Sequence, residues 1–363
     1  DYFEPMSWFR KKQRTGPPSG ILLVSSGGLG DTILMSLVIE RFTSLAELGE
    51  EITLALPRES LKMAFLFDHK ITIQPVDYKV FRKSKTYVKE ITDQFYDANF
   101  RLVISTDFLR HPKLDEAIIK ACEAEDVVAM EPRSWPKYDR ALKKNRTLYS
   151  RLYDSGPTHM DKVVRWANFA DWLTGKKAPP PQIRLPEKQV KAVEEYPRPT
   201  VILVPFSAVK EKQSPPEAFL TLMEYLKDGY DFVIAGAPND LENNPEFRVL
   251  MNLPNVSFDG SVFEELAPKL KKSRLVISVD TATMHLAVAL GVPTVCLASA
   301  AYVNEITPYA PEITPDNVRF VYQPMECEGC LGNCLLPTEA GRFPCVARIE
   351  MPQVLKAVDE LLK

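Results

Sequence analysis

The sequence lacks several features that would assign it to a large class of proteins. Its 363 residues contain no apolar run of the roughly 18 residues that a membrane-spanning helix needs. Lysine and arginine together number 45 against 48 acidic residues, so the strong basic excess of a nucleic-acid-binding protein is missing. A secretory signal pattern is missing as well. We therefore expect a cytoplasmic protein that has no nucleic-acid partner.

What the chain does contain is a repeated pattern of short apolar runs and longer helical stretches. Hydrophobic residues make up 45% and charged residues 26%, as in ordinary globular proteins, and the length suggests two domains. Nearly continuous apolar runs predict strands that are buried on both faces, and helices between them predict parallel sheets. The helical stretches include 216–226 and 262–270. The predicted strands are Ile21–Ser25, Ile52–Leu56, Leu102–Thr106, Val127–Met130, Val201–Pro205, Phe232–Ala235, Leu275–Val279 and Thr294–Leu297.

A proline-rich segment separates the two series of strands. Pro179-Pro180-Pro181 cannot lie inside a helix or a central strand. We expect an α/β protein with two doubly wound, Rossmann-like parallel-sheet domains that face a cleft, where ligands bind at the carboxyl ends of the strands. The predicted parts are an N-terminal acceptor-side domain (15–173), a linker (174–199), a C-terminal nucleotide-binding domain (200–350) and a last helix (351–363).

A glycine-rich loop follows the first predicted strand and leads into a helix expected from about Ile33. The spacing of Gly27, Gly28 and Gly30 differs from the dinucleotide fingerprint and from the phosphate-binding Walker loop. This weakens an alternative function as a nicotinamide-dependent oxidoreductase. Asp31 follows these glycines, and two roles are open for its carboxylate: a helix cap, or a general base that accepts the proton of an attacking hydroxyl.

A second group of candidate residues, 278–285, lies at the start of a predicted helix late in the chain, and Gly291 marks the end of that helix. The free N–H groups of residues 281–284, which include Thr281, Ala282 and Thr283, would form a cradle for a diphosphate. Asp280 is expected to position this loop or to bind sugar hydroxyls. His285 either donates a hydrogen bond to a phosphate or belongs to the core.

Three further candidates follow the first two strands of the second series. Ser207 and Lys212 could hold and neutralise phosphate oxygens, although a loop lysine is often only solvated. Asp240 could bind ribose hydroxyls, with Glu242 as a weaker candidate. Cationic residues also follow strands of the first series and could meet anionic groups of an acceptor, although positions on the solvated surface are expected; these are Arg82, Lys83, Arg110 and His111.

Taken together, these residues resemble the heptosyltransferase family, glycosyltransferase family 9. The family shows Gly-Asp after its first strand, here Gly30-Asp31. It also shows Asp-Thr-Gly-x-x-His at the start of a late helix, here 280–285, followed by Gly-x-Pro, here 291–293. Its lysine loop corresponds to 207–212. The resemblance covers roughly residues 20–350; the late motif is fairly specific, whereas Gly-Asp alone is weak.

The resemblance implies a GT-B fold, inversion at the anomeric carbon and no catalytic metal. It implies Asp31 as the base, with Lys212 and the turn 281–285 on the donor diphosphate. The default donor is ADP-heptose, and the acceptor is a glycan or glycolipid such as lipopolysaccharide core. Ala282 stands where the family usually has glycine, and its methyl group leaves the donor sugar open.

Four of the six cysteines lie within nineteen residues, at Cys327, Cys330, Cys334 and Cys345. Disulfides are disfavoured in a reducing cytoplasm, and this spacing suits a tetrahedral thiolate site. Zinc, a single iron ion and an iron–sulfur cluster all fit, as do reduced structural thiols or a labile disulfide. We predict a structural metal site in loop 327–345, with Cys122 and Cys296 as core residues.

Two further hypotheses concern partners. The segment 6–14 combines two aromatic residues with four cations, a composition that suits peripheral contact with the inner face of the inner membrane, although a solvated tail is the simpler interpretation. The alternative to a transferase is a catalytically silent protein that binds a nucleotide sugar or acts as a scaffold, with a structural metal site formed by the four clustered cysteines.

Overall fold

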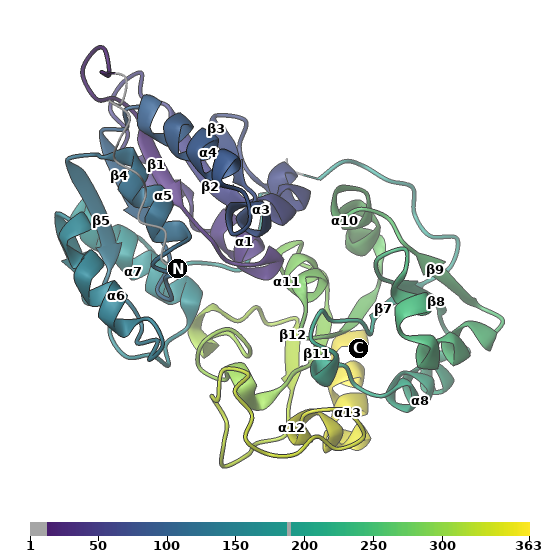
Figure 1. The fold of residues 1–363 in the computed structure, drawn as a ribbon. Helices are drawn as coiled ribbons and strands as arrows, with labels where there is room; N and C mark the ends of the chain where they lie inside the picture. The colour runs from purple at the N-terminus through teal and green to yellow at the C-terminus, as the bar shows by residue number, and fades with distance from the viewer. Residues whose placement is uncertain (1–12, 187–189) are drawn as a thin grey trace. The chain divides into compact units, whose positions relative to one another are not determined.

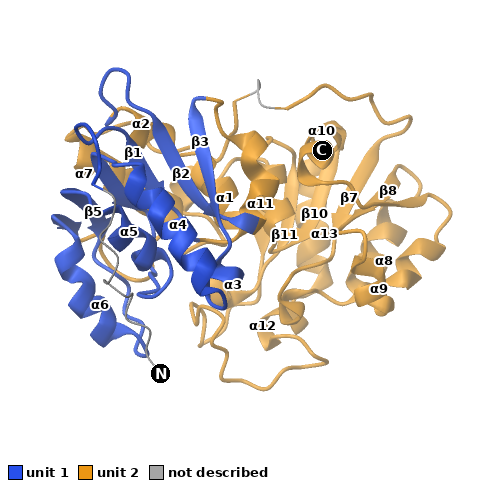
Figure 2. Cartoon of the chain, turned by 45° about the horizontal axis from the view of Figure 1, so that its top comes forward, with its two compact units in different colours: residues 1–26, 45–58, 70–153 blue, residues 27–44, 59–69, 154–363 orange. Residues whose placement is uncertain are grey.

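The computed structural model describes residues 13–186 and 190–363, which fold into two compact units (Figures 1 and 2). Unit 1 comprises the described residues up to Ser26 together with 45–58 and 70–153. Unit 2 comprises 27–44, 59–69 and the described residues from Asp154 onward. Within the described ranges, none of the helices combines the length and the apolar composition that crossing a membrane requires. The predicted domain limits differ from these groupings and stay a prediction.

Unit 1 is built on a six-stranded parallel sheet with the order β3-β2-β1-β4-β5-β6. The strands are β1 (Ile21–Val24), β2 (Ile52–Pro57), β3 (Ile71–Val76), β4 (Leu102–Ser105), β5 (Asp126–Met130) and β6 (Arg151–Tyr153). Its helices are α3 (Tyr78–Phe81), α4 (Lys85–Asp97), α5 (Asp115–Cys122), α6 (Asp139–Asn145) and the short 3-10 helix η2 (Arg146–Leu148).

The core of unit 1 lies between the sheet and helices α4 and α5 (Figure 1). Alternate residues of β1, Leu22 and Val24, point to this side, where they meet Phe95 of α4 and Ile118 of α5. Burial of such apolar side chains is the main favourable contribution to folding.

Unit 2 contains a second six-stranded parallel sheet, ordered β12-β11-β10-β7-β8-β9. The strands are β7 (Thr200–Val204), β8 (Asp231–Ala235), β9 (Val256–Asp259), β10 (Leu275–Val279), β11 (Thr294–Leu297) and β12 (Val318–Val321). The α-helices are α1 (Leu29–Ser36), α2 (Glu40–Thr43), α7 (Lys162–Thr174), α8 (Pro216–Leu226), α9 (Asp240–Asn243), α10 (Phe263–Lys272), α11 (Ala282–Ala289), α12 (Pro344–Ala347) and α13 (Met351–Leu362). The 3-10 helices are η1 (Arg58–Leu66, of which Arg58 belongs to unit 1), η4 (Lys210–Lys212), η5 (Pro245–Asn252), η6 (Ala300–Tyr302) and η7 (Pro311–Ile313).

One face of this second sheet packs against α8, η5 and α13. Phe219 of α8, Phe247 of η5 and Val358 of α13 are fully buried there against residues such as Ile277 of β10. The last helix, α13, lies beside β11 and β12 (Figure 1). Both sheets therefore have the doubly wound order, with a reversal of strand order between β1 and β4 and between β7 and β10.

The α/β class and the two parallel sheets confirm the fold predicted from the sequence. All eight predicted strands are present, and the helix predicted at 216–226 is α8. Four strands were not predicted: β3, β6, β9 and β12. They are the edge strands of the two sheets, and their residues are partly exposed, so the sequence shows no continuous apolar run there.

Candidate active site

The loop after β1 leads directly into α1. This helix begins at Leu29, so the prediction of a start near Ile33 is wrong and Gly30 and Asp31 lie in the first helical turn. The earlier start is possible because Gly28 serves as the N-cap and its backbone N–H donates to Asp31 Oδ2 at 2.9 Å. The carboxylate of Asp31 therefore does cap the helix. Its second oxygen remains for other partners.

Each glycine of this loop has different neighbours. A Cβ added at Gly27 would lie 2.5 Å from the Cβ of Asp31, and one at Gly30 would lie 3.1 Å from Cδ2 of His285. A Cβ at Gly28 would meet, among the described residues, only Asp31 Oδ2 at 4.0 Å. Gly27 lets the loop pass close to Asp31, and Gly30 lets α1 approach α11.

Asp31 forms an ion pair with Lys162, which the sequence analysis did not identify. Lys162 Nζ donates to Asp31 Oδ1 at 2.6 Å, and about a quarter of each side chain is exposed (24% and 23%). Burial alone would raise the pKa of Asp31, but the charge and hydrogen bond of Lys162 and the Gly28 N–H outweigh it, so the pKa is lowered. Asp31 is thus ionised at neutral pH and able to accept a proton.

The position of Lys162 at the start of α7 is fixed by Asp161. The Asp161 carboxylate accepts hydrogen bonds from the backbone N–H groups of Val163, Val164 and Ala310. The backbone N–H of Lys162 itself donates to the carbonyl of Glu305 at 2.8 Å. The first turn of α7 is therefore tied to the segment 305–310, and Lys162 is held at a defined place.

A second ion pair lies at the point where strand order reverses in the sheet of unit 2. Lys212 follows β7 and Asp280 follows the neighbouring strand β10, and Lys212 Nζ is 2.8 Å from Asp280 Oδ2. Only 12% of the lysine side chain and 5% of the aspartate side chain are exposed. The ammonium group also lies over the ring of Tyr302, 5.0 Å from its centre. Lys212 is therefore almost buried and is held by two contacts, the Asp280 carboxylate and the Tyr302 ring. It is not the solvated lysine that a loop position would usually suggest.

The helix α11 follows Asp280 and carries the remaining residues of the late motif. Thr281 is its extended N-cap and Ala282 its first residue, so the helix presents backbone N–H groups at its start. His285, one turn later, is buried, and its Nδ1 lies 2.6 Å from the hydroxyl of Tyr309. Burial lowers the pKa of His285 to about 4, although the carboxylates of Asp280 and Asp31 act in the opposite direction. The imidazole is neutral at neutral pH, and Thr283 beside it is also buried.

The two ion pairs belong to one cluster, because α1 packs against α11 within unit 2. Ser207 and Asp240 lie nearby in topology, after the adjacent strands β7 and β8. Ser207 Oγ accepts from the Val209 N–H at 3.3 Å, and Asp240 Oδ2 accepts from the Ala237 N–H at 2.6 Å. Each of these bonds shapes the loop that carries it and leaves the Ser207 O–H and Asp240 Oδ1 for other partners. The structure thus brings together Asp31, Lys212, Asp280 and His285 and adds Lys162 to them.

The four clustered cysteines line one small cavity of ≈ 10 Å³ together with residues of η6 and α12. Two backbone bonds join their loop to η6, from Gly329 N–H to the Ala300 carbonyl (2.8 Å) and from Leu331 N–H to the Ala301 carbonyl (2.7 Å). A Cβ at Gly332 would lie 3.0 Å from the hydroxyl of Tyr302. Among residues 13–186 and 190–363, no group of three His, Cys, Asp or Glu side chains is placed to hold a metal ion as it stands. Cys122 and Cys296 are buried.

The structure also bears on two other predictions, the surface position of Arg110 and the membrane contact of segment 6–14. Arg110 was expected on the solvated surface, but its side chain is 1% exposed and forms an ion pair with Glu116 at 3.0 Å, so that prediction is wrong. In the N-terminal segment, residues 6–12 lie outside the described residues. Arg14 donates to the carbonyls of Cys122 and Glu123, which anchors it to α5 rather than leaving it free for a membrane surface.

Comparison with known proteins gives a family and a fold. The model of glycosyltransferase family 9 (heptosyltransferase) matches residues 132–329, more than half of the chain. No curated protein sequence matches significantly. Among solved structures, a family 9 glycosyltransferase from Veillonella parvula is 17% identical with a TM-score of 0.70, over 95% of this chain and 97% of that one.

Two further structures share the architecture. The Escherichia coli ADP-heptose lipopolysaccharide heptosyltransferase II is 16% identical, with a TM-score of 0.64 over 94% of this chain and 98% of that one. The iron-containing dodecameric glycosyltransferase TibC of enterotoxigenic E. coli is 14% identical, with a TM-score of 0.54 over 96% of this chain and 77% of that one. The fold is GT-B, as the sequence resemblance implied.

Proposed function

Because the chain belongs to glycosyltransferase family 9, we propose that it transfers a sugar from a nucleotide diphosphate to an acceptor hydroxyl, with inversion at the anomeric carbon. The observation that carries this proposal is the packing of α1 on α11, which brings the ionised carboxylate of Asp31 into one cluster with the Lys212–Asp280 pair and the start of α11. Glycosyl transfer needs these two groups together: a base for the attacking hydroxyl and positive charge for the leaving diphosphate.

The donor proposed is ADP-heptose. The heptosyltransferase II of E. coli, which shares the fold, uses this donor by its name. Lys212 and the free N–H groups at the start of α11 would face the diphosphate, so no catalytic metal is needed to neutralise it. Asp280 and Asp240 would accept hydrogen bonds from sugar and ribose hydroxyls, and Ser207 would donate to a phosphate oxygen. His285 is neutral and supports α1 beneath this site.

The reaction proposed is a single displacement. The acceptor oxygen attacks the anomeric carbon while its proton passes to Asp31, and the bond between that carbon and the diphosphate oxygen breaks. The electron pair leaves with the diphosphate, whose added negative charge Lys212 and the α11 terminus stabilise. Lys162 holds the carboxylate in place and keeps it ionised until the proton arrives.

The acceptor proposed is a glycan or glycolipid such as lipopolysaccharide core, the acceptor class in the name of the E. coli enzyme. We place the reaction at the cytoplasmic face of the inner membrane, where a glycolipid acceptor would be reached. The basic and aromatic residues among 6–12 support this placement through their composition.

The test of the base is Asp31→Asn. We expect the substitution to lower kcat by about 10²–10⁴-fold while ADP binding is retained, because the amide can still cap α1 but cannot accept a proton. Asp77→Asn is the matched control, since Asp77 is another capping aspartate, which accepts two backbone N–H groups as the N-cap of α3 in unit 1. Full turnover by the Asp31 variant would show that another group is the base.

The donor is identified by thermal shift with ADP, UDP, GDP, CMP, ADP-heptose and NAD. A ligand that binds only the folded state raises the melting temperature, so ADP and ADP-heptose should give selective shifts. A shift with NAD alone would instead favour an oxidoreductase. Binding of ADP-heptose without turnover on any glycan acceptor would favour the silent nucleotide-sugar-binding alternative.

We also propose that the cysteine loop holds one structural metal ion, zinc or iron. The four thiols line one cavity, so they lie close enough together to supply the ligands of a single ion. Rotation of the side chains would have to complete the tetrahedral set. TibC, a glycosyltransferase of the same fold, is iron-containing by its name.

Elemental analysis of the purified protein tests this assignment. One metal ion per chain is expected, with Cys330→Ser lowering the metal content and Cys122→Ser, a substitution outside the loop, leaving it unchanged. Cobalt substitution should give the absorption bands of tetrahedral thiolate ligation. Metal-free protein whose loop cysteines are all reactive toward thiol reagents would contradict the site.

A further inference from the structure

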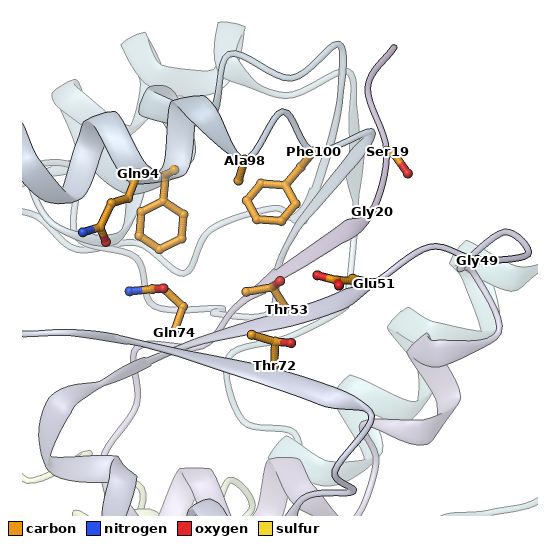
Figure 3. A pocket seen from close by; sticks show the side chains of 11 residues that line it. Ser19, Gly20, Gly49, Glu51, Thr53, Thr72, Gln74, Gln94, Ala98 and Phe100 are labelled. Carbon is orange, nitrogen blue, oxygen red and sulfur yellow. The ribbon is translucent and has the colours of Figure 1, made fainter. Parts of the chain in front are cut away.

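Unit 1 contains a cavity of ≈ 340 Å³ that the proposed transfer reaction does not use (Figure 3). Gly20 and Glu51 immediately precede β1 and β2, and Thr72 is the second residue of β3. These strands are parallel, so the cavity opens at the amino ends of the sheet. The loop that carries the glycines and leads to Asp31 follows the carboxyl end of β1. The cavity is thus separate from the edge at which doubly wound sheets place their main ligand.

The walls of this cavity differ in chemistry. Phe95 and Phe100 supply two largely buried aromatic rings on one wall. Figure 3 shows Phe100 and Ala98 on the opposite side of the space from Thr53 and Thr72. Gln74 and Gln94 lie toward one end of the cavity, and Glu51 lies toward the other. One side is therefore apolar, and the rest offers hydroxyl, amide and carboxylate groups.

Several of these polar groups have unused hydrogen-bonding capacity. Among the described residues, the side chains of Glu51, Thr53 and Gln94 have no protein hydrogen-bond partner. Gln74 has one long bond to the carbonyl of Pro75 at 3.4 Å. Amide and hydroxyl groups can both donate and accept, and the carboxylate accepts two bonds per oxygen, so the cavity suits a ligand with several hydroxyl groups.

The charge and the volume of the cavity further restrict the class of ligand that it can bind. Among the described residues that line the cavity there is no lysine or arginine, and Glu51 is a carboxylate, so phosphates and nucleotide sugars are disfavoured. The volume lies at the lower end of the range of about 300–1,000 Å³ for small-molecule sites. We propose that this cavity binds an uncharged pyranose, whose C–H groups contact the apolar side formed by Ala98 and the edges of Phe95 and Phe100 while its hydroxyls bond to Thr, Gln and Glu side chains.

The pyranose could be a free monosaccharide or one unit of a glycan chain. Saturation-transfer NMR on the full chain distinguishes the two, with methyl glucoside, galactoside and mannoside in one arm and neutral trisaccharides in the other. We expect binding with Kd of about 1 mM, typical of a shallow site with few contacts. Tighter binding of trisaccharides identifies a glycan unit, and equal binding identifies a monosaccharide.

Ala98→Trp fills the cavity from the exposed end of α4 and should weaken sugar binding at least about tenfold. Asp97→Trp is the matched control, because the neighbouring Asp97 is also exposed but does not line the cavity. Thr72→Trp, from the opposite wall, gives a second blocking variant whose effect does not depend on α4. All three variants should keep the melting temperature and the ADP binding of the parent protein.

Absence of saturation transfer to every neutral glycoside would overturn the proposal. Binding that survives both Ala98→Trp and Thr72→Trp would overturn it as well, since the sugar would then bind elsewhere. The proposal is independent of the transfer reaction: an inactive Asp31 variant should bind these glycosides as the parent does, and failure of ADP to bind would leave this test unaffected.

Discussion

Asp31 caps α1 with its carboxylate, and in the proposed reaction the same carboxylate is the base. Oδ2 accepts the Gly28 N–H and closes the first turn of α1, while Oδ1 faces Lys162. The two interpretations left open by the sequence, helix cap and candidate base, therefore do not exclude each other. A capping bond fixes the direction of the carboxylate, and a base needs such a fixed direction toward the hydroxyl that it deprotonates.

Lys162→Met should move the acid limb of the pH profile of kcat/KM to higher pH. Lys162 lowers the pKa of Asp31, so without it burial raises that pKa and the base becomes protonated at a higher pH than in the parent. At neutral pH the loss of activity should be smaller than for Asp31→Asn, because the carboxylate remains.

Lys269→Met is the control for removal of a paired lysine, since Lys269 forms an ion pair with Asp259 at 2.7 Å in α10 and β9. Lys162→Arg should restore the parent profile. An unchanged acid limb in Lys162→Met would mean that Lys162 has no influence on the ionisation of the base.

Sequence motifs could identify Asp31, Lys212, Asp280 and His285, because each lies in a short pattern at a strand end. Lys162 could not be found in this way. It lies 131 residues from Asp31, and a lysine after a helix-capping aspartate is unremarkable in sequence. Only the packing of α7 within unit 2 gives it a partner. Arg110 shows the reverse case, since a cation after a strand was expected at the surface and is buried with Glu116.

At the level of elements, the loop after β1 passes close to the first turn of α1. We therefore expect alanine substitutions at the adjacent glycines 27 and 28 to differ strongly in their effect on activity. Gly27→Ala should lower kcat by about 10²-fold or more, because its Cβ would lie 2.5 Å from the Cβ of Asp31 and displace the carboxylate. Gly28→Ala has space around its Cβ and a φ of -73°, so activity should be close to that of the parent.

Steady-state kinetics with melting temperatures of both variants checks this difference. Equal activity of the two variants, with equal stability, would show that the loop can move away from Asp31 without loss. Gly27 was noted in the sequence only as part of a glycine-rich loop, and its steric role depends on where α1 begins, four residues before the predicted start.

The elements of this chain differ in how far their sequence reveals them. Central strands such as β1 and β10 are fully buried and read as apolar runs. In the edge strand β3 only the first and last residues are buried, and its interior contains Gln74 and Pro75; β6 has only three residues. Edge strands face solvent on more sides, so their composition approaches that of loops.

At the scale of the whole molecule, the same sheet order occurs twice, and in unit 2 the strand reversal between β7 and β10 coincides with the Lys212–Asp280 pair. Alternating strands and helices were sufficient to predict this architecture. The sequence could not show that Gly27–Ser44 and α7 group with unit 2, because that depends on packing between distant segments. Asp31 and the start of α11 consequently share one compact unit.

The cysteine loop and Lys212, the cation of the proposed donor site, are connected through one side chain, Tyr302. The loop is bonded to η6, which ends at Tyr302, and the ring of Tyr302 lies beneath Lys212. An ion that orders the loop would therefore restrict the platform on which the ammonium group rests, and the two ligands would be energetically coupled. Removal of the metal by a chelator should then weaken ADP binding, as calorimetry can measure, while Tyr302→Leu should remove the difference between metal-loaded and metal-free protein. Such coupling is reciprocal, so ADP would strengthen the binding of the metal by the same factor. The protein with bound ADP would therefore retain the metal better than the protein without it.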